Sequence, residues 1–587
     1  MFKLIKNFKK KDWLIVLVSI VLIVMQVWLE LKMPDYMSKV TVLVQTEGSK
    51  MSEILKNGGY MLLCAFGSLV GAVIVGYLIA LLASGFSRNL RSKLFRKVED
   101  MSMSEIKEFS TNSLITRTTN DITQVEMFIG FGLQLLIKAP VTAVWAITKI
   151  LNKSWEWSMV TAVAVVVLLI VIGILTIVVM PKFKIVQKLT DKLNEVTREN
   201  LTGIRVVRAF NAEEYQQEKF QDVNNSLTNL QLFNQKTMSI MAPVMYLVMY
   251  MLTLVIYFIG AYLIKDALMA DKISLFGDMV VFSSYAMQII MAFLMLAMIF
   301  MILPRAQVSA SRINEVLDTS VSVIDGKVTN KDEIGTVEFK NVSFKYPDAE
   351  EYVLKNISFK ANKGDTVAFI GSTGSGKSTL VNLIVRFYDV TEGEILIDGV
   401  NIKDYKLEYL YKLIGYVPQR AVMFNGTVNS NISYGKAMEE ISDKKIVEAA
   451  KVAQADEFIS KMDDGYESHI AQGGTNVSGG QKQRIAISRA IAKNPEIYIF
   501  DDSFSALDYK TDAVLRSELK KYTKDATSLI VAQRIGTIMN ADKIIVLDNG
   551  ESVGVGTHKE LLKSCEVYKQ IALSQLSKEE LDNAKTK

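Results

Sequence analysis

Hydrophobic residues in the first half of the chain gather in long runs that are separated by polar, largely basic segments. A helix needs about 20 mainly apolar residues to cross a bilayer. Six runs reach that length, at about 13–33, 59–84, 128–150, 157–180, 241–264 and 277–303. The pattern therefore predicts an all-α membrane domain whose six spans lie in a lipid bilayer.

Basic residues predict the side of the membrane on which each connection lies. Five lysines precede the first span, and Lys and Arg are frequent in 86–99 and 182–220, after the second and fourth spans. Cytoplasmic loops carry an excess of these residues. Because six spans return the chain to its starting side, we predict that both termini are cytoplasmic. We see no targeting signal, and together with the half-size layout this predicts a plasma or bacterial inner membrane.

Beyond about residue 305 the chain becomes polar and acquires the short β-patterns of a soluble protein. This change divides the sequence into four predicted parts. They are a transmembrane domain at 1–310, a linker at 311–335, a soluble domain at 336–575 and a C-terminal tail at 576–587.

Composition narrows the class of function. The net charge of the 587 residues is only +5, which gives no basic footprint for nucleic acid. The two cysteines, Cys64 and Cys565, lie in different parts of the chain, so we expect no structural disulfide. Two histidines in the whole chain argue against a histidine-rich metal site.

A phosphate-binding motif follows the strand pattern DTVAFIG. The match to G-x-x-x-x-G-K-[ST] is complete, with a strand before it and a helical segment after it. Backbone N–H groups and the helix N-terminus can surround phosphates there, Lys377 can reach the β- and γ-phosphates of ATP, and Ser378 can ligate Mg²⁺. The predicted nucleotide-binding residues are Gly371, Ser372, Thr373, Gly374, Ser375, Gly376, Lys377, Ser378 and Thr379.

A second part of the same site is predicted at 497–501. The sequence IYIFD indicates a buried strand that ends on Asp501. A carboxylate at the end of such a strand meets the Mg²⁺ shell in P-loop proteins. We therefore expect the soluble domain to have an α/β P-loop fold, and ATP and Mg²⁺ to be its cofactors.

The segment VSGGQ at 477–481 resembles the signature of the ABC family, whose usual form is LSGGQ. Tyr346 resembles the aromatic residue that stacks on adenine, and Gln419 resembles the Q-loop glutamine, which senses the γ-phosphate and Mg²⁺. The sequence SALD, which ends on Asp508, resembles the D-loop. With its six spans, nearly the whole chain resembles an ABC exporter half-transporter. This resemblance implies that the α/β P-loop domain carries a helical subdomain.

The resemblance implies a dimer in which each ATP lies between the P-loop of one chain and the signature of the other. A second half-transporter is therefore the expected partner. The residues that would act on the partner's ATP are Ser478, Gly479, Gly480, Gln481 and Asp508.

Two positions depart from the family pattern. Asp502 stands where a hydrolysing member has Glu, and Gln533 stands where the family has His. The Asp carboxylate is one methylene shorter than that of Glu, and Gln cannot carry the positive charge of a histidine. Since displacement by about 1 Å can cost about 100-fold in rate, we expect this site to bind ATP and hydrolyse it slowly. This asymmetry resembles the degenerate-site subunit of heterodimeric bacterial multidrug exporters.

The resemblance also implies coupling helices at the tips of the cytoplasmic connections. The candidates lie at about 103–113 and 208–215, and Phe210 is the predicted apolar anchor of the second.

These observations predict a heterodimeric exporter that moves amphipathic small molecules, either drugs or lipids, and that hydrolyses ATP mainly at the partner's P-loop. Two alternatives remain. One is a homodimeric exporter of a lipid or peptide, and the other is a regulatory or sensor protein in which ATP binding gates a membrane partner.

Overall fold

The computed structural model describes residues 1–6, 8–151, 155–330, 335–435, 437 and 440–575. These residues form two compact units. The membrane unit holds Met1–Lys97 and Asn112–Asp318, and the nucleotide unit holds Val98–Thr111 and the chain from Thr319 onward. The predicted tail at 576–587 lies outside the described residues.

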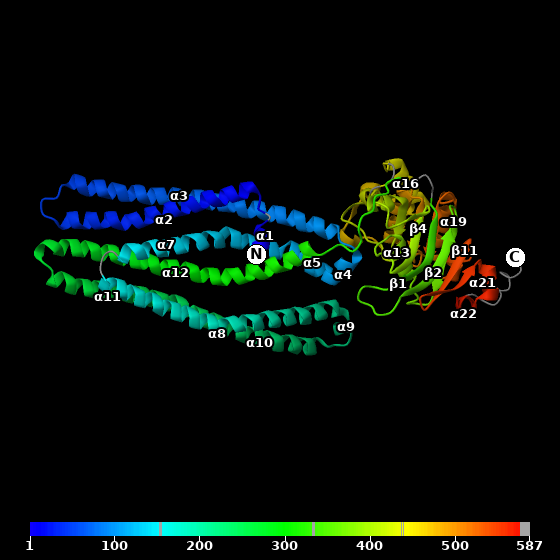
Figure 1. Cartoon of the computed structure of the whole chain (residues 1–587). Coiled ribbons are helices and arrows are strands. Elements are labelled where there is room, and N and C mark those ends of the chain that lie inside the picture. Colours follow the sequence, from blue (N-terminus) through cyan, green and yellow to red (C-terminus); the bar gives the residue numbers. More distant parts are fainter. Residues whose placement is uncertain (7, 152–154, 331–334, 436, 438–439, 576–587) are drawn as a thin grey trace. The chain divides into compact units, whose positions relative to one another are not determined.

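The described residues of the membrane unit are helical (Figure 1). Its elements are α1 (Phe2–Ile5), α2 (Lys10–Gln45), α3 (Met51–Glu99), α5 (Thr111–Thr118), α6 (Asn120–Met127), the π-helical turn η1 (Phe128–Gly132), α7 (Leu133–Leu151), α8 (Trp155–Thr202), α9 (Ile204–Ala209), α10 (Glu213–Ser239), α11 (Met241–Asp266) and α12 (Met269–Asp318).

Six helical stretches within the described residues are long and apolar enough to cross a membrane, which confirms the predicted all-α domain. They are Lys10–Gln45, Met51–Glu99, Thr111–Leu151, Trp155–Thr202, Glu213–Asp266 and Asp271–Asp318. The helices also reach beyond the predicted spans. In Figure 1, α9 joins the ends of the paired helices α8 and α10. Helix α12 continues to Asp318, so the first residues of the predicted linker are helical.

Apolar side chains of the membrane unit face two environments. Ile23, Val27 and Leu31 lie one turn apart on α2 and are buried between helices. Leu62 and Ile177 are among many large apolar side chains that remain exposed. An apolar exterior of this kind suits contact with lipid, because lipid chains are as apolar as the side chains themselves.

Two ion pairs join α2 to α7 inside the spans. Lys138 Nζ lies 2.9 Å from Glu30 Oε1, and Lys149 Nζ lies 2.8 Å from Asp35 Oδ2. The hydroxyl of Tyr285 on α12 also donates to Asp35, over 2.5 Å. Charged residues at this depth are costly unless they are paired. Three of the charged residues that the spans carry, Glu30, Lys138 and Lys149, are thus engaged with neighbouring helices.

The nucleotide unit contains twelve strands in its described residues. They are β1 (Val337–Phe344), β2 (Leu354–Ala361), β3 (Thr366–Gly371), β4 (Glu392–Ile397), β5 (Val400–Asn401), β6 (Ile414–Val417), β7 (Gly426–Thr427), β8 (His469–Ile470), β9 (Ile497–Asp501), β10 (Thr527–Val531), β11 (Lys543–Asp548) and β12 (Glu551–Gly556).

Three sheets result. The main sheet has the order β12-β11-β3-β10-β9-β6, in which only β12 is antiparallel to its neighbour. An antiparallel sheet has the order β2-β1-β4-β5, and β7 pairs with β8. The helices of this unit are α4 (Met103–Phe109), α13 (Lys377–Ile384), α14 (Leu407–Leu413), α15 (Val428–Ile432), α16 (Asp443–Val452), α17 (Asp456–Ile459), α18 (Gly479–Ala492), α19 (Tyr509–Tyr522), α20 (Ile535–Ile538), α21 (His558–Ser564) and α22 (Glu566–Gln575).

The main sheet is buried on both faces, as a parallel sheet requires. Successive residues of β9 alternate between two apolar cores. Ile497 and Ile499 pack on one side with β1 and β2, while Tyr498 and Phe500 pack on the other with α15, α16 and α18. This arrangement, with its helical subdomain, confirms the α/β P-loop fold expected for the soluble half.

Helix α4 belongs to the nucleotide unit although it lies within the N-terminal half of the sequence. Its N-cap residue Ser102 bonds through Oγ to Ser322 Oγ over 2.8 Å, and Glu105 accepts from the Ser322 backbone N–H over 3.2 Å. Lys107 reaches Asp348 at 3.5 Å. Helix α4, which forms most of the first predicted coupling segment at 103–113, therefore packs against the soluble half of its own chain.

Candidate nucleotide-binding site

The site forms where four parallel strands of the main sheet end. Across the β9–β10 pair, Asp501 lies opposite Val531, and Phe500 lies opposite Val417 in the β9–β6 pair. Strand β3 ends at Gly371, beside β10. Ligands of open α/β sheets bind at these carboxyl ends. The register therefore brings together the loops that carry the P-loop, Asp501, Gln419 and Gln533.

The P-loop turns tightly between β3 and α13. Gly374 and Gly376 have φ angles of +86° and +96°, which side chains of L-residues rarely adopt. A Cβ at Gly376 would also lie 2.6 Å from Leu354. The glycines at these two positions let the loop close and place the N-terminus of α13, which begins at Lys377, at the strand end.

Lys377 is folded onto the loop that precedes it. Its Nζ donates to the carbonyls of Gly371 and Ser372 over 3.0 and 2.7 Å, and to Ser375 Oγ over 3.3 Å. Burial lowers the pKa of Lys377, although the carboxylates of Asp501 and Asp502 oppose this effect. The ammonium group is thus held among oxygens at the strand ends, where phosphate oxygens would replace the carbonyls.

Ser378 and Asp501 form a pair of oxygen donors. The hydroxyl of Ser378 donates to Asp501 Oδ1 over 3.2 Å, and burial raises the pKa of Asp501. A hydroxyl and a carboxylate suit Mg²⁺, which prefers oxygen ligands and keeps several waters. Within the described residues, three or more His, Cys, Asp or Glu side chains do not gather at any metal-sized site. Gln419, phosphate and water would supply the other ligands of the cation.

Asp502 is the centre of a second hydrogen-bond group. Its Oδ2 accepts from Gln533 Nε2 over 2.8 Å and from Gln419 Nε2 over 3.2 Å. The residue has a φ of 47°, in the left-handed region, and burial raises the pKa of its carboxyl group. Of the three residues expected at the γ-phosphate end of the site, Gln419 and Gln533 therefore both contact Asp502 directly.

Tyr346 lies beside the first turn of α13. Its hydroxyl is 3.0 Å from Thr379 Oγ1, and its ring packs edge-on against Phe344 and Tyr388. The ammonium group of Lys107, on α4, lies 5.4 Å from the centre of the Tyr346 ring. The expected adenine-stacking residue is thus oriented by neighbours on β1, α13 and α4.

The signature residues form the N-terminus of α18. Ser478 is the N-cap, and its Oγ accepts from the Gln481 N–H over 3.3 Å, while the Ser478 N–H donates to Gln481 Oε1 over 2.8 Å. This capping box leaves Gly479 exposed at a helix end that favours anions. A Cβ on Gly480 would lie 3.3 Å from the carbonyl of Ala506, so the signature and the D-loop pack closely.

Asp508 ends the D-loop and caps α19. Its carboxylate accepts from the Thr511 N–H over 3.0 Å, and this backbone hydrogen bond lowers the pKa of Asp508. The carboxylate is therefore ionised and fixed at the helix start.

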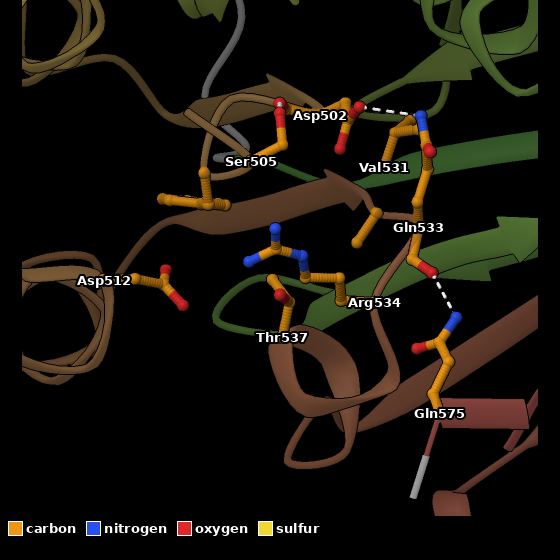
Figure 2. A pocket seen from close by; sticks show the side chains of 10 residues that line it. Asp502, Ser505, Asp512, Val531, Gln533, Arg534, Thr537 and Gln575 are labelled. Atoms are coloured by element: carbon orange, nitrogen blue, oxygen red, sulfur yellow. Dashed lines mark hydrogen bonds between the residues drawn. The ribbon is translucent and has the colours of Figure 1, made fainter. Parts of the chain in front are cut away.

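A cavity of about 300 Å³ lies beside Asp502 (Figure 2). It is lined by Asp502, Phe504, Ser505, Asp512, Val531, Ala532, Gln533, Arg534, Thr537 and Gln575. In Figure 2 the side chain of Gln533 points to Asp502, while its carbonyl points to Gln575. Sequence reasoning missed Gln575, because a glutamine on a late helix carries no motif that marks it.

Both units match known protein families. The family described as "ABC transporter transmembrane region" matches residues 14–293, and the family described as "ABC transporter" matches residues 354–505. An uncharacterized ABC transporter ATP-binding protein of Mycobacterium tuberculosis is 39% identical over 88% of this chain and 87% of its own length. A similarly named protein of Bacillus subtilis is 36% identical over 87% and 88%.

Other similar proteins have more specific names. The ATP-dependent lipid A-core flippase of Pseudomonas aeruginosa is 33% identical over 84% of this chain and 80% of its own length. The structure of a bacterial Atm1-family ABC exporter with ATP bound superposes with a TM-score of 0.81, covers 96% of this chain and 98% of its own, and is 24% identical. At that identity the likeness concerns the fold.

Proposed function

Because this chain belongs to the ABC transporter family, as a half-transporter with one membrane unit and one nucleotide unit, we propose that it is one subunit of a heterodimeric exporter. Membership of the family implies ATP binding and hydrolysis. The finer proposal is that this chain's P-loop holds ATP with little turnover, that the partner's P-loop hydrolyses it, and that the cargo is an amphipathic drug or lipid.

The observation that carries the proposal is the contact between Asp502 and Gln533. Hydrolysis needs a carboxylate that orients or deprotonates the attacking water and a group that stabilises charge on the γ-phosphate. Here the shorter carboxylate is occupied by the amide of Gln533, and that amide is neutral. Both departures weaken the same step, which supports slow hydrolysis at this site.

The groups that bind nucleotide are present and close together. Lys377 and the N-terminus of α13 supply positive charge for the phosphates, and Tyr346 supplies an aromatic face for adenine. Ser378, Asp501 and Gln419 would hold Mg²⁺, which neutralises charge on the phosphate oxygens when bound. The site is thus equipped for binding more completely than for hydrolysis.

The signature of this chain is suited to serve a partner's nucleotide. Ser478, Gly479, Gly480 and Gln481 form a capped helix N-terminus, and Asp508 is fixed at the adjoining turn. An exposed helix N-terminus attracts phosphate. This is the support for ATP turnover at the partner's P-loop.

Exposed apolar side chains on and directly after α9 suit a contact between the membrane unit and a nucleotide unit. Phe210 follows α9 and is 79% exposed, and Val206 on the same helix is also exposed. An exposed aromatic anchor of this kind is typical of interface residues. We propose that α9 docks on a nucleotide unit and transmits its movement to α8 and α10.

The orientation proposed for the chain follows from charge. The basic ends of α3 and α8 favour the cytoplasmic face of a plasma or inner membrane, with both termini inside. ATP is supplied on that side, so substrate would leave in the outward direction.

A homodimeric lipid exporter is the second candidate. It is favoured by the similarity to proteins named as ATP-dependent lipid A-core flippases. In a homodimer both sites would contain Asp502 and Gln533, and turnover should be very slow.

Steady-state ATPase activity separates these functions. We expect the purified chain alone to be nearly inactive, the complex with its partner to be active, and a Glu→Gln change at the partner's hydrolytic position to abolish turnover. The Lys377→Ala variant controls for contaminating ATPases. An ordinary exporter rate for the chain alone would overturn the proposal. It would show that Asp502 and Gln533 are competent catalytic residues, and a homodimer with two active sites would then replace the heterodimer.

The double variant Asp502→Glu with Gln533→His tests the cause. It should raise the activity at this site by about 100-fold, since it restores the position of the carboxylate and a chargeable group. No gain from the double variant would mean that the two residues are not the reason for slow turnover.

A further inference from the structure

The last residue of α22 bonds to the backbone on both sides of Arg534. The side-chain oxygen of Gln575 accepts from the Ile535 N–H over 2.8 Å, and its side-chain nitrogen donates to the carbonyl of Gln533 over 2.8 Å. Both polar groups of one amide are thus used on one loop. Two bonds from a planar amide fix the orientation of the loop as well as its position.

Helix α22 is held in place by side chains that pack into the core of the nucleotide unit. Tyr568 and Ala572 are fully buried, and the Tyr568 hydroxyl lies 2.7 Å from His558 Nδ1. Gln575 follows these residues at helical spacing, so all three lie on one side of α22. The outer part of Gln575 is exposed, which means that its replacement leaves the core of α22 intact.

A second contact holds helix α20, which begins directly after this loop. Arg516 on α19 donates to the carbonyl of Gly536 over 2.8 Å and forms a hydrogen-bonded ion pair with Asp512. Gln533 itself lies beyond the end of β10, between that strand and α20. Gln575 therefore holds the part of the loop that Arg516 does not reach.

The backbone carbonyl and the side chain of Gln533 form hydrogen bonds with two different residues. The carbonyl accepts from Gln575, and the side chain donates to Asp502 over 2.8 Å. Figure 2 shows this division. A shift of the Gln533 backbone would move its amide away from the place where the γ-phosphate is expected.

We propose that Gln575 is a positioning residue that holds the Gln533 loop, so that helix α22 sets how Gln533 meets the γ-phosphate of bound ATP. The inference rests on the proposed nucleotide site, and it goes beyond that proposal by giving α22 a part in nucleotide retention. The proposal requires that Gln575 affects nucleotide release through Gln533, and that this effect is present with ATP and absent with ADP, which lacks the γ-phosphate.

The test is the release rate of two fluorescent nucleotides from the full-length chain, alone and with its partner. One is a non-hydrolysable ATP analogue and the other is an ADP analogue. Gln575→Met keeps the length of the side chain and removes both bonds. We expect it to speed release of the ATP analogue about three- to tenfold, the effect of losing a hydrogen bond, and to leave ADP release unchanged.

Ser574→Ala is the matched control, because Ser574 is the exposed neighbour whose hydroxyl bonds to the carbonyl of Ile571 within α22. It should change neither rate. Gln575→Glu keeps the acceptor for Ile535 and loses the donor to Gln533, so it should resemble Gln575→Met.

A double-mutant cycle with Gln533→Ala decides the route of the effect. If Gln575 acts through the Gln533 side chain, Gln575→Met adds nothing once that side chain is removed. Equal acceleration of ATP and ADP release, or additive effects in the cycle, would overturn the inference. Failure of the heterodimer proposal would appear instead in the ATPase activity of the chain alone, which these release rates do not measure.

Discussion

The side-chain nitrogen of Gln533 lies 2.8 Å from Oδ2 of Asp502 and donates a hydrogen bond to it. These are the two positions at which we expect a hydrolysing member of the family to carry Glu and His, and in this chain their side chains are hydrogen-bonded to each other. Gln419 donates to the same oxygen over 3.2 Å. The carboxylate of Asp502 is therefore held by two amides, and water would have to compete with both.

This arrangement predicts that Asp502→Asn stabilises the nucleotide-free chain at neutral pH. Burial raises the pKa of Asp502, so the folded state disfavours the carboxylate and loses stability as the pH rises above 3.8, the ordinary pKa of an aspartate. Asparagine keeps an acceptor for Gln533 and removes the charge. The unfolding temperature should rise by about 2–4 °C at pH 7, as about 1 kcal/mol would give, and the gain should fade towards pH 4.

The control for this measurement is Asp525→Asn, which removes a carboxylate at an exposed loop position. It should leave the unfolding temperature at pH 7 nearly unchanged. A lower unfolding temperature for Asp502→Asn at pH 7 would show that the hydrogen bonds to the carboxylate outweigh the cost of its burial.

Two variants of Tyr346 should separate the contribution of ring stacking to ATP affinity from that of the hydroxyl group. Tyr346→Ala removes the aromatic face, and stacking on a base contributes about 1–3 kcal/mol, so ATP affinity should fall about 5- to 150-fold. Tyr346→Phe keeps the ring and loses only the contact with Thr379, at 3.0 Å, so its loss should be smaller. Equilibrium binding of a fluorescent ATP analogue measures both. Equal losses in the two variants would argue against adenine stacking.

Breaking the ion pair between Glu30 and Lys138 should destabilise the membrane unit without changing ATP binding. Glu30 Oε1 also accepts from Gln26 and Ser68, over 2.9 and 3.1 Å, so its removal leaves several donors in a poorly hydrated place. Glu30→Ala should lower the free energy of unfolding in detergent by about 1.5–3 kcal/mol. ATP affinity should stay the same.

The matched control for this pair is the double change Glu30→Gln with Lys138→Met, which removes both charges and retains much of the side-chain volume. It should be closer to wild type than either single change, because the double variant leaves no unpaired charge whereas each single change leaves one. Purely additive losses would show that the two side chains do not interact in the membrane.

The sequence predicted features that depend on local pattern. The lengths of apolar runs indicated the six spans, and the P-loop motif placed Lys377 at a strand–helix junction. The sequence pattern could not predict which side chains of distant helices pair with each other. The runs show that Glu30 and Lys138 lie in or near spans, but the choice of partner depends on how α2 and α7 pack.

The same limit explains Gln575 and α4. A glutamine at the end of α22 is an ordinary surface residue by pattern, and its contact with Gln533 depends on the path of the chain through β11 and β12. Likewise, nothing in the sequence near Glu105 marks Ser322 as its neighbour, so the membership of α4 in the nucleotide unit emerged only from the fold.

Gly480 provides the prediction that tests the exchange of sites between two chains. If this chain's signature serves the partner's ATP, then Gly480→Asp puts a negative charge at the N-terminus of α18, where the phosphates of that ATP would lie. We expect the ATPase activity of the complex to fall about 100- to 1000-fold, comparable to the loss of a group that stabilises the transition state. ATP binding at this chain's own P-loop should persist, as photolabelling of each chain with an azido-ATP would show.

Gly480→Ala separates charge from space in this experiment. Its Cβ would lie 3.3 Å from the carbonyl of Ala506, so the alanine requires only a small local shift. It should reduce the activity of the complex much less than Gly480→Asp. If Gly480→Asp leaves turnover intact, this signature does not act on the partner's nucleotide. If it instead abolishes labelling of this chain alone, the signature acts within its own chain, and the heterodimer proposal loses its chemical basis.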